Sequence, residues 1–525
     1  MLTRRDFLQA TAGTTLWSLL PNSLRGESSG GARPNVLFLF SDQHHAGMTG
    51  YAGHPNMHTP ALDRLAAGGT RFERAYCQDG VCLPSRSSII SGQYPRTLGV
   101  YDNGKLKNAI YEAEIVPSLT SMPRAFREGG YYTFTAGKRH ILPSFDRDWD
   151  YSAGHLMPNQ WPSEAHDTLN YWIWIQQKGL MDLVQKDFDC EFGKNPTDFT
   201  LAISSLPPEG TMEAFTAQQT VDFLKSRKAK EKPFFAWSTF YRPHQPYTPQ
   251  RKYVDQIDFS SIRLPASLRQ DPSQLPPYLC HIRQSHKRAW DCANMKEADY
   301  RRYIGYYIAL VHEIDEHINN ILDVLEKEGL AENTIVVYSA DHGDFVGNHG
   351  LPEKQANGHN FYEETLRVPL IIRYPGKVQA GVVSQDLVEL VDLYPTLLDL
   401  CGMAVPKGPQ PAGRSLAETL RNRMPVGRSY VVSENWSQAA VITSGFKYGK
   451  WLRSVRTPTD DWRGWGNMLI DRSKDPNEVD NVFKDPAYAE KVEEMEGYLA
   501  EFVGKTDDSG RREYFDRSKV EYSNV

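Results

Sequence analysis

Short apolar runs recur along the chain, and each is flanked by polar residues. The clearest of them span 35–40, 131–135, 233–240 and 334–339. Uninterrupted runs of this length are typical of strands that are buried on both faces. Other stretches repeat apolar residues at helical spacing, most clearly 295–328, which ends at Gly329. Strands that alternate with helices predict an α/β fold with a large, mostly parallel sheet flanked by helices.

The last quarter of the chain has a different pattern. Short runs at 430–432, 440–442, 448–451 and 468–470 are separated by turns rich in Gly and Asp. They predict a small antiparallel sheet, and a helix at about 488–503 is expected to pack on it. A Pro/Gly-rich linker precedes these runs at 406–413. We therefore predict a large α/β domain over 33–404 and a C-terminal α+β subdomain over 405–525.

The first 32 residues have the pattern of a targeting segment. Arg4 and Arg5 form a twin-arginine pattern, a weakly apolar run over 7–20 follows, and 23–32 is a small, polar spacer. The apolar run is too short and too polar for a membrane span. We predict a signal segment over 1–32, the twin-arginine export machinery as a partner, and a periplasmic or extracellular location. The alternative is an amphipathic N-terminus of a cytosolic protein.

Charge and cysteine content narrow the function classes. The net charge of -6 argues against a general nucleic-acid binder, although it allows a locally basic pocket. No other apolar run is long enough to span a bilayer, so we expect no integral membrane span in the mature protein. The six cysteines are scattered and show no metal-type pairing. Cys280 and Cys292 could form a disulfide in an exported protein or remain two free thiols.

Polar residues that can do chemistry follow each of the four strands. They are Asp42 and Gln43, Lys138 and His140, His244, and Asp341 and His342. The carboxyl ends of parallel strands meet at one sheet edge, where α/β proteins bind ligands. The oxygens of the first pair suit a cation such as calcium. Read one at a time, these residues are more typical of helix caps, surface positions and structural loops.

One further segment, Cys82-Leu83-Pro84-Ser85-Arg86, is expected to begin a helix. Pro84 suits a first turn, and Gly92 is placed to end the helix. A helix N-terminus favours an anion, and the planar fork of Arg86 suits an oxyanion. On these residues alone, Cys82 could equally be an inert, partly buried thiol.

The motif Cys-x-Pro-Ser-Arg, followed by Gly92-Gln93-Tyr94-Pro95-Arg96, resembles the signature of the type I sulfatases of the alkaline phosphatase superfamily. Other segments resemble elements of the same family: Gly137-Lys138-x-His140, Pro243-His244, Asp341-His342, and Lys354 by its spacing. The resemblance runs from about Pro34 to the C-terminal helix. It implies an alkaline phosphatase-like sheet for the large domain.

The resemblance also implies the cofactors and the residue roles. A formylglycine-generating or sulfatase-maturing enzyme would convert Cys82 to 3-oxoalanine (formylglycine), whose hydrate attacks sulfur. One Ca2+ would be held by Asp42, Gln43, Asp341, His342 and an oxygen of residue 82. His342 is a softer ligand than calcium prefers, so the metal stays open.

The remaining site residues would stabilise negative charge and transfer protons. Arg86, Lys138 and Lys354 would offset negative charge in the transition state. His244 or Lys354 would protonate the leaving oxygen, and His140 would take a proton from the remaining hydroxyl to expel sulfate. Arg242 is a further candidate anion contact.

The predicted function is hydrolysis of a sulfate ester, with a sulfated carbohydrate as substrate. The tryptophan-rich stretch 142–205 is expected to be irregular, and it could supply a sugar-stacking platform or a buried aromatic cluster. Its tryptophans are Trp149, Trp161, Trp172 and Trp174. Two alternatives remain: a phosphonate or phosphate ester hydrolase of the same superfamily, and a catalytically inactive protein that binds sulfated glycans.

Overall fold

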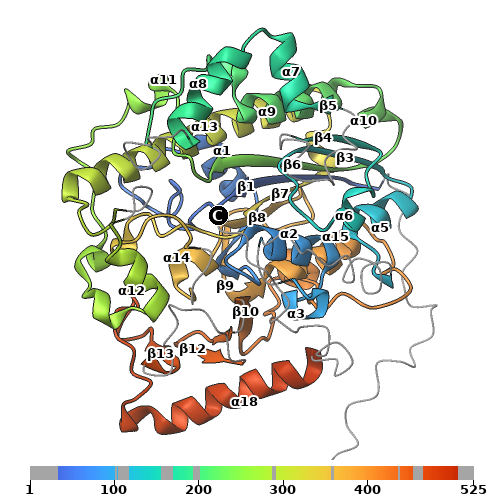
Figure 1. Ribbon diagram of the computed structural model, residues 1–525. Coiled ribbons are helices and arrows are strands. Elements are labelled where there is room, and N and C mark those ends of the chain that lie inside the picture. The colour runs from blue at the N-terminus through green and yellow to red at the C-terminus, as the bar shows by residue number, and fades with distance from the viewer. Residues whose placement is uncertain are drawn as a thin grey trace, which may run out of the picture. The chain divides into compact units, whose positions relative to one another are not determined.

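The computed structural model describes residues 33–100, 103, 118–154, 169–192, 201–286, 291–355, 360–435, 438–452 and 465–506 (Figure 1). Contacts divide the chain into two units, Met1–Arg33 and Pro34–Val525. The predicted signal segment over 1–32 lies outside the described residues. The domain boundary at 404/405 stays a prediction.

A nine-stranded sheet forms the centre of the second unit, in the order β5-β4-β3-β6-β1-β7-β8-β2-β9. Its strands are β1 (Asn35–Asp42), β2 (Thr70–Tyr76), β3 (Tyr132–Gly137), β4 (Tyr151–Gly154), β5 (Leu169–Asn170), β6 (Phe234–Pro243), β7 (Thr334–Ala340), β8 (Leu370–Arg373) and β9 (Val382–Glu389). All neighbours pair in parallel except β8, which runs antiparallel to both β7 and β2. The predicted mostly parallel sheet is confirmed.

Strand β1 is buried on both faces, as its apolar run predicts. Phe38 and Phe40 pack into the core on one side of the sheet, and Leu37 and Leu39 into the core on the other. Helices α2 (Cys82–Ser91), α5 (Met122–Glu128) and α15 (Leu393–Leu400) cover the first side. Helices α1 (Pro60–Ala67), α9 (Met212–Lys225) and α13 (Glu297–Lys327) cover the second side (Figure 1).

Shorter helices occupy the connections. They are α3 (Pro95–Leu98), α6 (Pro143–Asp146), α7 (Tyr171–Gln177), α8 (Met181–Phe192), α10 (Lys228–Glu231), α11 (Arg251–Val254), α12 (Pro277–Arg283), α14 (Glu363–Leu366) and α16 (Ala417–Asn422). The presence of α7 and α8 corrects the expectation that 142–205 is irregular throughout. Asn170 caps α7 by accepting a hydrogen bond from the Trp172 amide at 2.8 Å, and aromatic crowding hid the helical spacing in the sequence.

The described tryptophans of this stretch pack against the core on either side of the large sheet. Trp149 is buried and stacks on Phe235 and Trp237 at ring-centroid distances of 5.7 and 6.0 Å. Trp172 and Trp174 pack against the core that covers the α9 side. Trp149 therefore belongs to a buried aromatic cluster and not to a sugar-stacking platform. Trp161 lies outside the described residues.

The predicted C-terminal sheet and helix are both present. Strands β10 (Val431–Asn435), β11 (Gln438–Ile442), β12 (Phe446–Trp451) and β13 (Met468–Asp471) form an antiparallel sheet. Helix α18 (Ala489–Thr506) packs Met495 and Leu499 on one face of this sheet. Val431 and Ala440 point the other way, into the core shared with α2 and α15. The small sheet is thus held between α18 and the large domain.

Two other sequence expectations concern the chain as a whole. Among the residues that the structure describes, no helix combines the length and apolarity needed to cross a bilayer. Cys280 and Cys292 are both free thiols, so the alternative of a disulfide between them is not realised.

A buried ion pair fastens the small sheet to α14, and its loss should be measurable. Lys447 on β12 lies 2.6 Å from Glu478 and 3.1 Å from Glu363, and its side chain is fully buried. We expect Lys447→Met to lower the free energy of unfolding by about 2–3 kcal/mol, because it removes a buried cation and leaves Arg472, at 2.8 Å from Glu363 and 3.6 Å from Glu478, to balance both carboxylates. Denaturant unfolding measures this change.

Lys450 on the same strand provides the matched control. It pairs with Glu496 at 2.6 Å, but their side chains are 36% and 40% exposed. Lys450→Met should therefore cost less than about 1 kcal/mol. Equal losses for the two variants would show that burial of the Lys447 pair adds nothing.

Candidate active site

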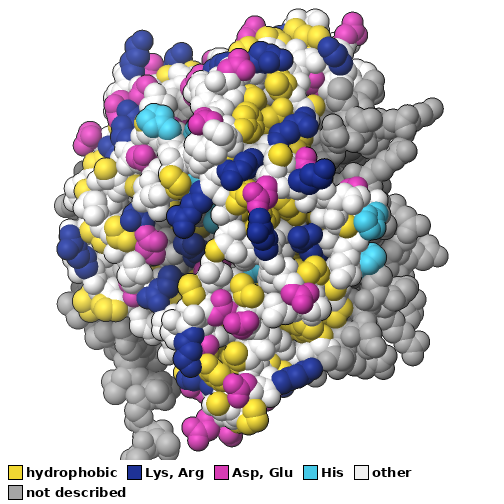
Figure 2. All heavy atoms as spheres, turned by 90° about the vertical axis from the view of Figure 1, so that its left-hand side faces the viewer, with side chains coloured by type: hydrophobic (Ala, Val, Ile, Leu, Met, Phe, Trp, Pro, Cys, Tyr) yellow, Lys and Arg dark blue, Asp and Glu magenta, His cyan; other side chains and the backbone are white. Residues whose placement is uncertain are grey.

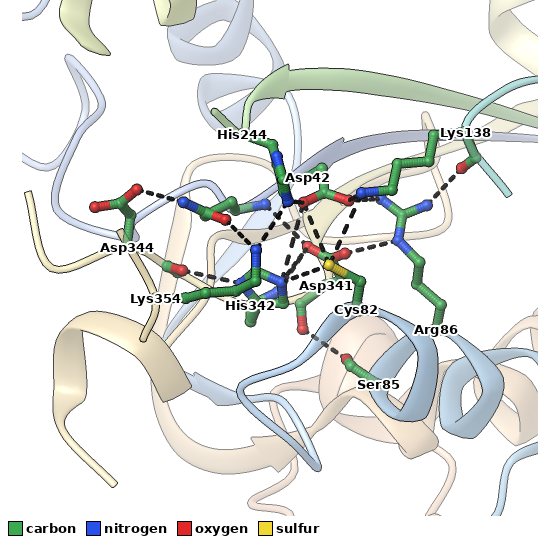
Figure 3. A network of polar contacts seen from close by, with 12 residues as sticks. Asp42, Cys82, Ser85, Arg86, Lys138, His244, Asp341, His342, Asp344 and Lys354 are labelled. Carbon is green, nitrogen blue, oxygen red and sulfur yellow. Dashed lines mark hydrogen bonds and ion pairs between the residues drawn. The ribbon is translucent and has the colours of Figure 1, made fainter. Parts of the chain in front are cut away.

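Cys82 begins helix α2, as predicted, and its side chain is buried. Val81 before it is extended, and Gly92 ends the helix in a left-handed conformation with φ of 67°. Ser85, in the first turn, donates a hydrogen bond to the Asp341 carbonyl at 2.6 Å, which ties the helix to the end of β7 (Figure 3). The helix therefore delivers its first residue to the carboxyl edge of the sheet.

The polar residues after the four strands do meet at this edge (Figure 3). Lys138 Nζ lies 2.7 Å from Asp42 Oδ2, and His244 Nε2 lies 3.9 Å from Asp42 Oδ1. His342 Nε2 lies 3.2 Å from Cys82 Sγ and 3.7 Å from Asp341 Oδ1. The structure thus places these predicted residues together, while their catalytic roles stay predictions.

Arg86 holds the two carboxylates in place. It is fully buried, donates from Nη2 to Asp42 Oδ2 at 2.8 Å, and donates from Nε to Asp341 Oδ2 at 2.6 Å. Its Nη1 donates to the Lys138 carbonyl at 2.5 Å and to Thr239 Oγ1 at 2.9 Å. Because the guanidinium fork is rigid, these contacts fix the ends of four strands relative to one another. Direct contact with an oxyanion, as the sequence suggested, stays a prediction.

The charges around residue 82 favour a negative group there. Burial raises the pKa of the Cys82 thiol, but the charges of Lys138, Lys354 and His342 outweigh it and hold that pKa well below its usual range. Burial also opposes the charge of Lys354, yet residue 82 and Glu353 raise the pKa of the Lys354 ammonium. The position of Sγ, where a reactive oxygen would stand after modification, is therefore suited to an anion.

His244 and His140, the two histidines predicted to move protons, are held as neutral bases. Burial, assisted by Lys354 and Lys138, lowers the pKa of His244 to about 3. His244 Nδ1 lies 2.5 Å from the Gln245 carbonyl and carries the proton, so Nε2 accepts from Lys354 Nζ at 2.8 Å. Burial likewise lowers the pKa of His140, whose ring is hydrogen-bonded to Cys82. Both can therefore accept a proton.

A group of ligand atoms at this edge fits a divalent cation. One ligand atom from each of Asp42, Cys82, Asp341 and His342 lies within 4.8 Å of all the others, and all four residues are buried. His342 Nδ1 donates to the Gly343 carbonyl at 2.9 Å, which turns Nε2 toward the group. Arg86 and Lys138 occupy Asp42 Oδ2, so Oδ1 faces residue 82.

Gln43 lies next to this group, but its side chain is already engaged. Its carboxamide oxygen accepts from Lys354 Nζ at 2.7 Å, and its nitrogen donates to Asp344 at 2.6 Å. A cation bound here would share that oxygen with Lys354. The oxygen donors suit calcium and the imidazole suits softer metals, so the residues fit a cation without selecting one.

The loops that carry the site have unusual backbone conformations. Among the described residues, eight non-glycine residues have a positive φ, and six of them lie in these loops: Gln43, His140, Val346, His349, Glu353 and Gln355. Such conformations persist only where the surrounding contacts enforce them, and they cluster at active sites. The loops are therefore fixed by packing rather than by local preference.

Sequence reasoning missed several residues that support the site. Tyr241 places its ring 4.9 Å from Lys138 Nζ and 5.0 Å from the His244 ring. Tyr247 and Tyr303 donate to Asp344. For Tyr303, the run of tyrosines on the predicted helix 295–328 was an available signal. Arg242, expected to contact an anion, donates to Thr248 Oγ1 at 2.7 Å and to the Pro246 carbonyl, so these contacts hold its own loop.

Comparison with known proteins identifies the family. The Sulfatase family model matches residues 34–403, and the model for the N-sulphoglucosamine sulphohydrolase C-terminal region matches 347–505. A Delta 4,5-hexuronate-2-O-sulfatase of Bacteroides thetaiotaomicron is 30% identical over 490 residues, covering 91% of this chain and 90% of that protein. An N-acetylglucosamine-6-O-sulfatase of the same organism is 26% identical over 540 residues, covering 89% and 86%.

Solved structures agree in fold. A 2-O GAG sulfatase superposes with a TM-score of 0.70 at 25% identity, covering 91% of this chain and 94% of that one. A phosphonate monoester hydrolase of Agrobacterium radiobacter gives a TM-score of 0.74 at 21% identity, covering 90% and 96%, which shows the shared fold alone. Because the Sulfatase model spans well over half of the chain, this protein belongs to the sulfatase family, within the alkaline phosphatase superfamily.

Proposed function

We propose that this chain hydrolyses sulfate esters of carbohydrates, with formylglycine at residue 82 and a bound Ca2+. The observation that carries the proposal is the buried group of Asp42, Cys82, Asp341 and His342, with Lys138 and Lys354 beside it. The names of the hexuronate and N-acetylglucosamine sulfatases similar to this chain support a sugar substrate. In the face shown in Figure 2, Lys and Arg side chains gather near the centre despite the net charge of -6, which suits an anionic substrate.

The cation and the modified residue would supply two things. When bound by Asp42, Gln43, Asp341, His342 and residue 82, the cation would polarise the sulfate oxygens and acidify the hydroxyl of residue 82. The formylglycine hydrate would provide the oxygen that attacks sulfur. Conversion of Cys82 requires a maturation enzyme, and twin-arginine export, which carries folded proteins, would let that conversion finish before export.

The chain's own residues would position the ester and move the protons. Lys138 and Lys354 flank residue 82 and would offset the charge on the transferring sulfuryl group. Lys354 holds its proton against the neutral Nε2 of His244, so this pair can deliver a proton to the leaving alkoxide oxygen. His140, neutral and against residue 82, would take a proton from the second hydroxyl, so that sulfate is expelled and the aldehyde restored.

The mass of the tryptic peptide Ala75–Arg86 tests the modified nucleophile. Protein made with a maturation enzyme should show thiol-to-aldehyde conversion at Cys82, located by fragment ions, with Cys77 unchanged. Two intact cysteines in an active enzyme would contradict the formylglycine mechanism. Two intact cysteines in an inactive protein that still binds sulfated glycans would favour the binding-protein alternative.

A substrate series with one leaving group tests the reaction class. Sulfate, phosphate and phosphonate esters of 4-nitrophenol differ only in the group transferred. We expect the highest kcat/KM for the sulfate ester. A higher value for the phosphonate or phosphate ester would replace the sulfatase assignment with the hydrolase alternative.

Removal of the metal should abolish most of the activity of the matured enzyme. We expect dialysis against a chelator to lower kcat/KM by about 100-fold or more, because the cation would supply charge that Lys138 and Lys354 cannot replace. Added Ca2+ should restore activity, and calorimetry should show one site per chain. Full activity in metal-free protein would contradict the proposed cofactor.

A further inference from the structure

We propose that Asp344 is a positioning residue for the metal site: it fixes the Gln43 carboxamide with its oxygen toward Lys354 and residue 82, and it supplies the negative charge that position 43 lacks. This inference rests on the proposed function, because it concerns how Gln43 would serve the cation. Asp344 follows Asp341-His342-Gly343 directly, and nothing in the sequence assigned it a role.

Gln43 is held at every polar atom. Its amide N–H donates to Asp341 Oδ1 at 2.9 Å, and its carbonyl accepts from Tyr307 at 2.7 Å. Its side-chain nitrogen donates to Asp344 Oδ2 at 2.6 Å, and its side-chain oxygen accepts from Lys354 Nζ at 2.7 Å. The backbone at Gln43 is left-handed, with φ of 64°, so these contacts hold a conformation that the residue would not choose alone.

Asp344 is a buried carboxylate that accepts hydrogen bonds at both oxygens. Oδ2 accepts from Gln43 and from Tyr247 at 2.8 Å. Oδ1 accepts from Tyr303 at 2.5 Å and from the Val346 amide at 2.8 Å. These donors come from separate parts of the chain and hold the carboxylate in place. Asp344 therefore always presents an acceptor oxygen to Gln43.

The orientation of the amide follows from its two neighbours. If the Gln43 carboxamide were turned over, its oxygen would face the Asp344 carboxylate and its NH2 group would face the Lys354 ammonium. The contact with Asp344, at 2.6 Å, would then set two acceptors against each other, and the contact with Lys354, at 2.7 Å, two donors. Asp344 and Lys354 together therefore leave one orientation, in which the oxygen faces the Lys354 ammonium.

The charge of Asp344 reaches the site through this amide. Its hydrogen-bond donors in the described part of the chain are all neutral: an amide side chain, two phenols and a backbone N–H. A carboxylate that accepts from one end of an amide makes the oxygen at the other end a stronger acceptor. Gln43 and Asp344 thus act together as one acidic ligand: Gln43 would contact the cation, and Asp344, which contacts Gln43, carries the negative charge.

A charge exchange between the two positions tests this coupling by calorimetric Ca2+ affinity of the full, matured chain. Asp344→Asn should weaken binding by about tenfold or more, because the Val346 N–H holds the introduced oxygen at the Oδ1 position and an NH2 group then faces Gln43. Gln43→Glu alone should not tighten binding, because the new carboxylate would meet Asp344 at hydrogen-bond distance. In the Asp344→Asn background, the same Gln43→Glu change should tighten binding by about tenfold, since the NH2 group of the introduced asparagine can donate to the introduced carboxylate.

Asp315→Asn provides the matched control for loss of a buried carboxylate. Asp315 accepts from the amides of Ala61 and Leu62 at 3.0 and 2.9 Å, and it caps α1. This variant should lower the melting temperature and leave Ca2+ affinity within about threefold of the wild type.

Each result decides the proposal. Wild-type affinity in Asp344→Asn, or tighter binding in Gln43→Glu alone, would overturn it; the second variant keeps the test valid if Asp344→Asn fails to fold. No Ca2+ binding by the wild type would overturn the proposed metal and this inference together. Normal wild-type binding with no coupling between the two positions would overturn this inference alone.

Discussion

Cys82→Ala is expected to abolish turnover, with kcat/KM for a sulfate ester falling by about 10,000-fold or more. Alanine removes the atom that would attack sulfur, and the loss of a nucleophile costs most of the catalysis that depends on it. The cations around the position remain, so binding of the ester should change much less than kcat. Steady-state kinetics with a chromogenic sulfate ester, combined with calorimetric binding, measure both.

Cys77→Ala is the matched control. Cys77 is also buried, lies on the same tryptic peptide, and has its Sγ 3.7 Å from the Thr365 carbonyl rather than in the site. Its alanine variant should turn over at close to the wild-type rate. Turnover by Cys82→Ala that matched this control would place the nucleophile elsewhere.

Cys82→Ser separates the two halves of the reaction. An unconverted serine hydroxyl can accept a sulfuryl group, but the resulting ester has no neighbouring hydroxyl to expel sulfate. We therefore expect, at most, one labelled sulfate retained per chain and no further release. Multiple turnovers by an unconverted serine would show that the second hydroxyl is not needed.

The position of the site could be predicted from the sequence because it depends on local patterns. Each buried strand is recognisable from its own residues, and parallel strands necessarily bring their carboxyl ends to one edge. Asp42, Lys138, His244 and Asp341 follow such strands, so their meeting required no knowledge of distant contacts. The helix that begins at Cys82 was likewise visible in its own residues.

The contacts that orient the site could not be predicted in this way. Gln43 and Asp344 are separated by 301 residues, and a hydrogen bond between them leaves no trace in either local pattern. The same holds for Arg86, whose fork suggested an oxyanion contact but whose donors face Asp42 and Asp341. Local sequence shows which groups a segment offers, whereas tertiary packing decides which of them are already engaged.

Helix α7 was missed for a different reason. Aromatic residues are bulky enough to pack from either a helix or a strand, so Tyr171, Trp172 and Trp174 obscure the helical period. The cap at Asn170 and the buried pair Tyr171 and Ile175, four residues apart, are clear only when the neighbouring core is known. Composition alone favoured an irregular loop.

Arg86→Lys should have the second large effect, and it should reduce both activity and stability. Lysine keeps the charge but cannot donate to Asp42, Asp341 and the Lys138 carbonyl from one rigid plane. We expect kcat/KM to fall by about 1,000-fold, because two predicted metal ligands lose their common anchor. The free energy of unfolding should fall by about 3 kcal/mol, the scale for disrupting a buried charge network. Kinetics and denaturant unfolding measure the two losses separately.

Arg428→Lys shows which part of that loss is specific to the site. The side chain of Arg428 is 6% exposed and also forked, donating to Asp392 at 2.6 and 2.7 Å, but it serves the packing beside β9 and takes no part in the site. This variant should lose stability on the same scale while kcat/KM stays within about threefold of the wild type. A similar fall in kcat/KM for both variants would mean that activity follows stability alone. A fall confined to Arg86→Lys would mean that the geometry of the two carboxylates, and not the charge at their side, is what the reaction requires.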